Sequence, residues 1–118
     1  MLRTIILLIS VSLASTLSLV HADTCKNIQA KISNKTKDTV DVISIDYLST
    51  EGQWRNGLTL KKPLQPNIVW TQTLDLDDSS DAKTQLKVSF QTDKGTNRSS
   101  NSSAFACKNN QSVSVELK

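Results

Sequence analysis

From residue 23 onward, apolar and polar residues alternate along much of the chain, and no other feature constrains the fold as strongly. The clearest run extends from Ala82 to Phe90, where every second residue except Thr84 is apolar. Successive side chains of a strand point to opposite faces, so such a run predicts a strand with one buried face. Shorter runs raise the expected number of strands to six or seven, with polar turns between them; these runs lie at 28–32, 40–47, 54–60, 68–76, 105–107 and 113–117.

Three segments depart from simple alternation. In the run at 40–47 the pattern changes phase between Val42 and Ile43, which indicates either a strand covered on both faces or a β-bulge at that point. Residues 61–67 include two prolines, which lack the amide hydrogen of a ladder, so this segment is predicted to be a loop or an edge. Residues 96–103 are nearly all Ser, Asn and Thr, which favours an exposed loop or a weak edge strand.

The first 22 residues have the composition of a secretory signal peptide. Arg3 supplies a positive start, an apolar stretch follows from Ile5 to Leu13, and Ala22 ends a small-residue cleavage site. An uncleaved membrane anchor is the alternative, but a span needs about 20 apolar residues and the serines here interrupt the segment. We therefore expect a cleaved signal peptide at 1–22 and a single domain at 23–118, with no transmembrane segment in the mature chain.

Two cysteines remain after cleavage, and they lie near the two ends of the mature chain. Cys25 and Cys107 allow one intramolecular pairing, and export provides an oxidising compartment in which a disulfide persists. A disulfide between them is expected, with the protein secreted or periplasmic. Together with the strand pattern, this predicts an all-β fold, a small antiparallel β-sandwich of immunoglobulin-like architecture, with a small barrel as the alternative.

The composition of the mature chain excludes several chemistries. Cleavage removes His21, the only histidine, so a serine or cysteine nucleophile has no usual base. Most acidic residues fall in predicted turns, where solvent surrounds them, and this disfavours a pair of catalytic carboxylates. We expect a protein that is not an enzyme and needs no cofactor.

Calcium is the one metal that the sequence raises, and it does so weakly. Asp75, Asp77 and Asp81 occupy alternating positions that resemble the first ligands of a calcium loop. Ser80 stands where such a loop has its glycine, and Leu86 where it has its bidentate glutamate. No metal site is therefore predicted, and these three residues are only a weak candidate for calcium binding.

Net charge gives no reason to expect a nucleic-acid partner. Removing Arg3 from the 14 basic residues leaves 13 against 11 acidic ones, a balance of +2. Nucleic-acid-binding domains carry a stronger basic excess. Four Asn-x-Ser/Thr sequences lie in predicted loops, where glycans are tolerated if the host attaches them; they begin at Asn34, Asn97, Asn101 and Asn110.

These observations predict an exported, non-enzymatic binding domain whose partner is a protein or a glycan at the cell envelope or in a host. Loops at the ends of a rigid scaffold commonly carry binding sites. Trp54, Arg55 and Asn56 follow a predicted turn and are the first candidates, unless Trp54, which is in phase with Leu58, caps the core instead. Trp70 is in phase with Leu74 and is expected in the core. The alternatives are a membrane-active or pore-forming protein and a secreted enzyme inhibitor that acts through a protruding loop.

Overall fold

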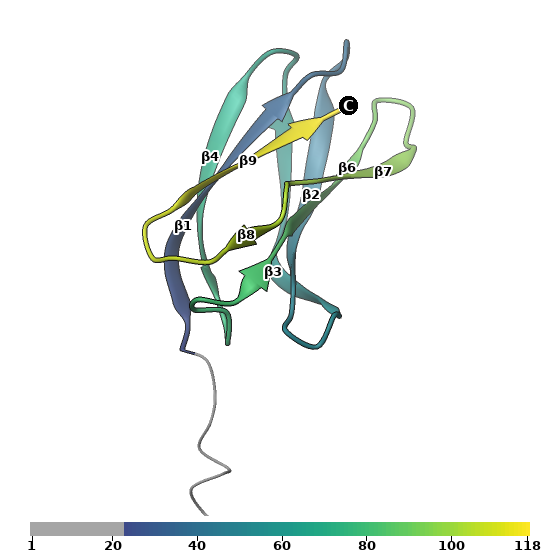
Figure 1. Ribbon diagram of the computed structural model, residues 1–118. Helices are drawn as coiled ribbons and strands as arrows, with labels where there is room; N and C mark the ends of the chain where they lie inside the picture. Colours follow the sequence, from purple (N-terminus) through teal and green to yellow (C-terminus); the bar gives the residue numbers. More distant parts are fainter. Residues whose placement is uncertain (1–22) are drawn as a thin grey trace, which may run out of the picture.

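The structure is a computed structural model that describes residues 23–118; the expected signal peptide lies outside the described residues. Every regular element in this range is a strand, which confirms the all-β prediction (Figure 1). The nine strands are β1 (Cys25–Asn34), β2 (Val40–Leu48), β3 (Trp54–Leu64), β4 (Val69–Leu76), β5 (Lys83–Thr84), β6 (Leu86–Gln91), β7 (Asn97–Asn101), β8 (Phe105–Ala106) and β9 (Ser112–Leu117). Residues 23–118 contain no helix with the length and apolar character needed to cross a membrane.

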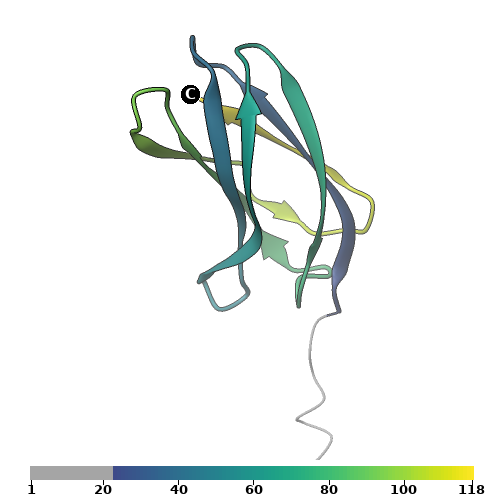
Figure 2. The ribbon, with the colours of Figure 1, turned by 180° about the vertical axis from the view of Figure 1, so that it is seen from behind.

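The longer strands form two facing sheets, an arrangement like a β-sandwich (Figures 1 and 2). One sheet has the order β4-β1-β9 and the other the order β3-β2-β6-β7, while β5 and β8 form a separate short pair. All pairs are antiparallel except β1 and β9, which run parallel. The expectation of a wholly antiparallel arrangement is therefore wrong at this pair.

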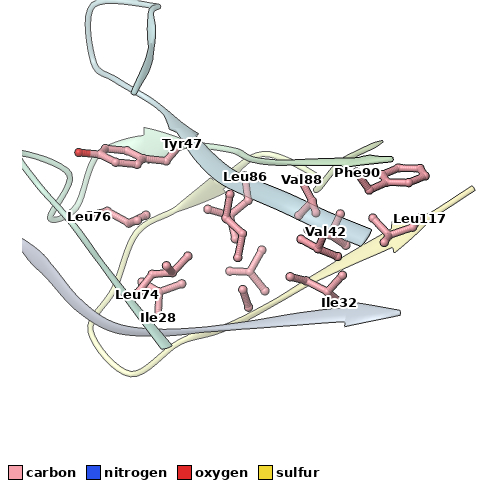
Figure 3. Packing of buried hydrophobic residues seen from close by; sticks show 14 of the residues in the cluster. Ile28, Ile32, Val42, Tyr47, Leu74, Leu76, Leu86, Val88, Phe90 and Leu117 are labelled. Carbon is pink, nitrogen blue, oxygen red and sulfur yellow. The ribbon is translucent and has the colours of Figure 1, made fainter. Parts of the chain in front are cut away.

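The core lies between the two sheets (Figure 3) and is built mostly from the residues that the alternation predicted. Leu64 is an addition from the segment that was expected to be a loop or an edge, and it ends the edge strand β3. Fully burying a side chain of this kind contributes about 1.5–3 kcal/mol relative to exposure, so the inner faces provide most of the driving force for folding. The buried apolar residues of the longer strands are Ile28, Ala30 and Ile32; Val40, Val42, Ile45 and Tyr47; Leu64; Leu74 and Leu76; Leu86, Val88 and Phe90; and Val113, Val115 and Leu117.

Strand β2 has the bulge that its change of phase indicated. The register of β2 shifts between Val42 and Ser44 against both of its neighbours, β3 and β6. The extra residue restores the inward orientation of Ile45 and Tyr47, which are buried like Val42. Of the two explanations for the phase change, the bulge is confirmed.

A second irregularity in β3 overturns the predicted phase of Trp54. Ile45 pairs with Leu58 and Asp46 with Asn56, so Gly57 is an extra residue between the two pairs. A Cβ atom at Gly57 would lie 3.0 Å from the Ile45 carbonyl oxygen, which explains why glycine occupies this close approach. The extra residue places Trp54 on the opposite side of the sheet from Leu58.

A disulfide closes one end of the sandwich. Cys25 at the start of β1 and Cys107 after β8 are bonded, with their Cα atoms 6.2 Å apart and both residues fully buried. The backbone N–H of Cys107 donates to the Ala82 carbonyl, and its own carbonyl accepts from the N–H of Asp81. The predicted disulfide is therefore confirmed, and it ties the first strand to the segment that follows the short β5–β8 pair.

The buried side chain of Asn34 organises the opposite end, where a solvent-exposed turn was expected. Its Nδ2 donates to the carbonyl oxygens of Asp38 and Leu64, both at 2.8 Å. Its Oδ1 accepts from the backbone N–H of Thr36 at 2.9 Å and from the Thr36 hydroxyl at 2.7 Å. The backbone N–H of Asn34 donates to the Ile68 carbonyl. Asn34 thus holds the β1–β2 turn against the β3–β4 connection, at the end where the C-terminus lies (Figure 2).

Candidate binding surfaces

Trp54 lies on the outer face of the four-stranded sheet and does not cap the core. It pairs with Leu48 at the end of β3 and is 37% exposed. The Lys87 ammonium lies over its ring, 4.5 Å from the ring centroid. This is a cation–π interaction, in which the positive charge is attracted to the face of the aromatic ring. Trp54 is thus available to a partner, but Lys87 covers part of its ring.

Asn56 shares this outer face and extends it with polar groups. Its Nδ2 donates to Asp46 Oδ1 at 3.1 Å, and its Oδ1 accepts from the Thr59 hydroxyl at 3.3 Å. The register places Lys87 beside Asp46 on the next strand. The outer face next to Trp54 is therefore a mixed surface of amides, hydroxyls and paired charges.

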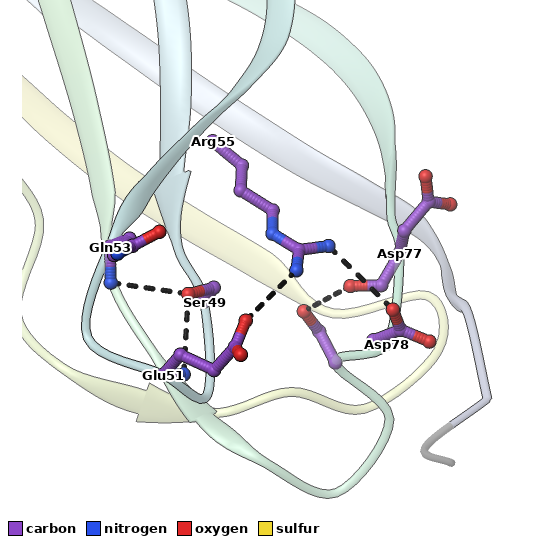
Figure 4. A network of polar contacts seen from close by, with 7 residues as sticks. Ser49, Glu51, Gln53, Arg55, Asp77 and Asp78 are labelled. Atoms are coloured by element: carbon purple, nitrogen blue, oxygen red, sulfur yellow. Dashed lines mark hydrogen bonds and ion pairs between the residues drawn. The ribbon is translucent and has the colours of Figure 1, made fainter.

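Arg55 points to the other side of β3, so the three predicted residues do not form one surface. It pairs with the buried Tyr47 and reaches across the disulfide end of the sandwich to two carboxylates (Figure 4). One Nη atom lies 3.3 Å from Glu51 and the other 3.6 Å from Asp78. Partial desolvation lowers the pKa of Arg55, but the hydrogen bonds and charges of Tyr47 and Glu51 outweigh it and raise the pKa above its ordinary value. Arg55 is engaged in holding two turns together.

The acidic turn residues do not come together as a calcium site. The Oδ1 atom of Asp75 accepts the backbone N–H of Asn27 at 3.0 Å, and Asp81 forms an ion pair with Lys108. No group of three or more potential metal-binding side chains occurs between residues 23 and 118. The aspartates of this segment instead stabilise turns and neighbouring backbone.

A second surface, which the sequence did not reveal, lies around the β3–β4 connection. Ile68 is 47% exposed and Val69 is 58% exposed, more than any other large apolar side chain among the described residues. They line a hollow together with Lys62, Pro63 and the half-buried Trp70. The Lys62 ammonium lies 5.8 Å from the centroid of the Trp70 ring. Trp70 packs against the core as predicted, and its other side contributes to this hollow.

Because Ile68 is in phase with Trp70, the alternation predicted that Ile68 would be buried, whereas it is exposed. No pattern in the sequence marks this surface; in the structure, hydrogen bonds from Asn34 to Leu64 and Ile68 fix the backbone on both sides of the connection. Burial of Asn34 also removes one glycosylation candidate from the folded protein, since its Nδ2 already donates two hydrogen bonds. The other three candidates, Asn97, Asn101 and Asn110, are exposed.

A scan against models of protein families, a search of curated proteins and a search of solved structures each gave no match to this chain.

Proposed function

We propose that residues 23–118 are an exported, non-enzymatic binding domain that is secreted or periplasmic and has an immunoglobulin-like sandwich. The buried disulfide supports the compartment, because such bonds persist where the environment is oxidising. The two facing sheets support the architecture, although the parallel pairing of β1 with β9 is one distinctive feature.

The observation that carries this proposal is the exposure of apolar side chains on a disulfide-bonded, two-sheet scaffold. Trp54, Ile68 and Val69 are the large apolar residues that the described chain leaves exposed, and two of them adjoin a hollow. Aromatic and aliphatic side chains beside a hollow are typical anchors of binding interfaces. The strands and the Asn34 hydrogen bonds hold this surface in place before a partner arrives, which reduces the entropy lost on binding.

A protein partner fits these surfaces better than a glycan. A sugar ring stacks on an open aromatic face, but Lys87 lies over the ring of Trp54. Trp70 is half-buried, and Lys62 lies near its ring within the hollow. The more exposed residues, Ile68 and Val69, are aliphatic and match the apolar side chains of a polypeptide.

The test is capture of a partner by the exported, disulfide-bonded protein, compared with two surface variants. One variant carries Ile68→Ser and Val69→Thr, and the other carries Trp54→Ala. Envelope extracts, extracellular fluid and a glycan panel are passed over each immobilised form, and retained molecules are identified by mass spectrometry. We expect a protein that the wild type retains and the Ile68/Val69 variant loses.

Lys83→Ala serves as the control, since Lys83 is exposed and lies at the disulfide end, away from the hollow. If only the Trp54 variant loses the partner, the binding function stands and the binding site is on the outer face of the four-stranded sheet. Failure to retain any partner from the three sources contradicts the proposal.

A further inference from the structure

The free edge of β4 is a second feature that bears on recognition. We propose that this edge binds an extended acidic segment of a partner protein as an additional strand, an inference that rests on the proposed binding function. Addition of a strand to an exposed sheet edge is a general mode of peptide recognition, in which main-chain hydrogen bonds supply affinity and side-chain pockets supply specificity.

The hydrogen-bonding groups of β4 are arranged for such an addition. The backbone N–H of Asn34 donates to the Ile68 carbonyl, which sets the phase of the antiparallel ladder that alternates regularly along β4 from there. Val69, Thr71 and Thr73 consequently direct their N–H and C=O groups away from β1. In agreement, the Thr73 carbonyl is reached by the Gln72 side chain at 3.1 Å. Within residues 23–118 no strand pairs with β4 on this side.

The edge of β4 also lacks the features that usually prevent strand addition. Natural edge strands are protected by lysine, proline, bulges or short length. From Val69 to Leu74 the strand has no charged residue and no proline, and its pairing with β1 is regular from Leu74 to Val69. Strand β3, the neighbouring edge of the other sheet, carries Lys61, Lys62 and Pro63. Only one of the two adjacent edges is therefore open to a partner strand.

Charge complementarity indicates that the added segment is acidic. Residues directly opposite one another on neighbouring strands point to the same face, so the partner residue opposite Trp70 faces the hollow beside Lys62. Four lysines lie at this end, and none forms an ion pair within the described range: Lys35, Lys37, Lys61 and Lys62. The acidic residues of the adjoining turn and strand, Asp38 and Asp41, leave a local excess of positive charge.

A second copy of the chain fits this edge less well. Because opposite residues share a face, Trp70 of one copy can lie opposite only Trp70, Gln72, Leu74 or Leu76 of the other. None of these is acidic, and Asp75 would lie on the outer face. Self-pairing therefore leaves Lys62 without a partner, whereas a segment with alternating aliphatic and acidic residues contacts both Val69 and Lys62.

The experiment selects short peptides from a random displayed library on the exported, disulfide-bonded protein. We expect selected sequences to be enriched in Glu and Asp, rich in Val, Ile and Thr, and depleted in Lys and Pro. Thr71→Pro removes an N–H from the free edge, without touching the ladder to β1, and is expected to weaken binding of selected peptides at least about tenfold. Lys62→Glu is expected to reverse the charge preference toward Lys and Arg.

Thr71→Ala is the matched control, because it removes the side chain but keeps the N–H, and Lys83→Ala is a control at a distant surface. Both are expected to bind selected peptides as the wild type does. If Thr71→Pro does not fold, as judged by its melting temperature, the charge reversal at Lys62 decides the question alone.

Several results overturn the inference. They are the absence of acidic enrichment, equal binding by the Lys62→Glu variant, self-association that Thr71→Pro abolishes, and binding to anionic phospholipid vesicles without peptide selection. If a native partner is captured through Trp54 and no peptide is selected at β4, the proposed binding function stands and only the proposal of strand addition is overturned.

Discussion

Different chemistry closes the two ends of the sandwich: a covalent bond joins Cys25 and Cys107 at one end, and hydrogen bonds of Asn34 join two turns at the other. The disulfide acts mainly on the unfolded chain, whose conformational freedom it restricts. Asn34 acts only in the folded chain, where its loss removes the side-chain donor to the buried Leu64 carbonyl. Ile68, Val69 and the four lysines near the hollow lie at the hydrogen-bonded end, whereas Trp54 lies toward the disulfide end. The comparison shows that the covalent closure and the hollow with its two most exposed apolar residues lie at opposite ends of the same strands.

The largest expected effect tests the covalent end. For the 82-residue separation of the cysteines, chain entropy predicts a contribution of about 4.5 kcal/mol to the free energy of unfolding. Replacing both cysteines by serine is expected to lower the melting temperature by at least about 10 °C in differential scanning calorimetry. Each single variant should be equally or more damaging because it leaves an unpaired thiol. A fall of only a few degrees would show that this end is held by other contacts.

Asn34→Ala tests the hydrogen-bonded end and is expected to be the next most damaging change. It removes one donor to the Asp38 carbonyl, which the Thr36 hydroxyl also reaches at 2.9 Å, and it removes the donor of the buried bond to the Leu64 carbonyl. A loss of about 2–3 kcal/mol is expected from urea unfolding, since each unsatisfied buried group costs about 1–3 kcal/mol. Asn97→Ala, at an exposed asparagine, is the control and should change stability by no more than about 0.5 kcal/mol. Equal losses of stability from the two substitutions would contradict the structural role assigned to Asn34.

Arg55→Ala tests whether charge adds to closure at the disulfide end. Arg55 and its partners Glu51 and Asp78 are all substantially exposed, so solvent and salt weaken their attraction. We expect a small fall in melting temperature at low salt that disappears in about 1 M sodium chloride, where the screening length is ~3 Å. A fall in melting temperature as large as that of the cysteine substitutions, or one independent of salt, would contradict the conclusion that the disulfide is the main bond closing this end.

The smallest expected effect on stability concerns the exposed apolar surface. Ile68→Ser combined with Val69→Thr should change the free energy of unfolding by no more than about 0.5 kcal/mol per substitution, because both side chains are largely exposed. The same variant is expected to lose the captured partner. Unfolding in urea and partner capture, measured on one preparation, separate the two roles; a strongly destabilised variant would place these residues in the scaffold instead.

Alternation was sufficient to predict the inner faces of β1, β6 and β9, because burial of one face imposes a period of two. The bulge in β2 was also detectable, since it changes the phase of the apolar residues themselves. The bulge at Gly57 was not, because the polar residues around it have no phase to change. Trp54 was therefore assigned to the side of Leu58, whereas the structure places it on the outer face.

Two other features depend on contacts between segments that are distant in the sequence. Asn34 is of a residue type common in exposed turns. Its burial is explained only by its hydrogen bond to the Leu64 carbonyl, 30 residues later in the sequence. Parallel pairing of β1 with β9 likewise leaves no local pattern. Of the three binding residues proposed from sequence, Trp54 and Asn56 share a surface and Arg55 does not, since neighbouring residues of a strand alternate in direction.

The central position of β1 has a consequence for the order in which the chain acquires structure. This strand leaves the ribosome first among the nine, yet one of its two edges is completed only by β9, whose residues are 112–117. The three-stranded sheet therefore cannot be completed until nearly all of the chain has been synthesised. Contacts of such long sequence separation also form slowly. Under the proposed export, the polypeptide would accordingly remain translocation-competent during its synthesis, and the domain would mature on the far side of the membrane.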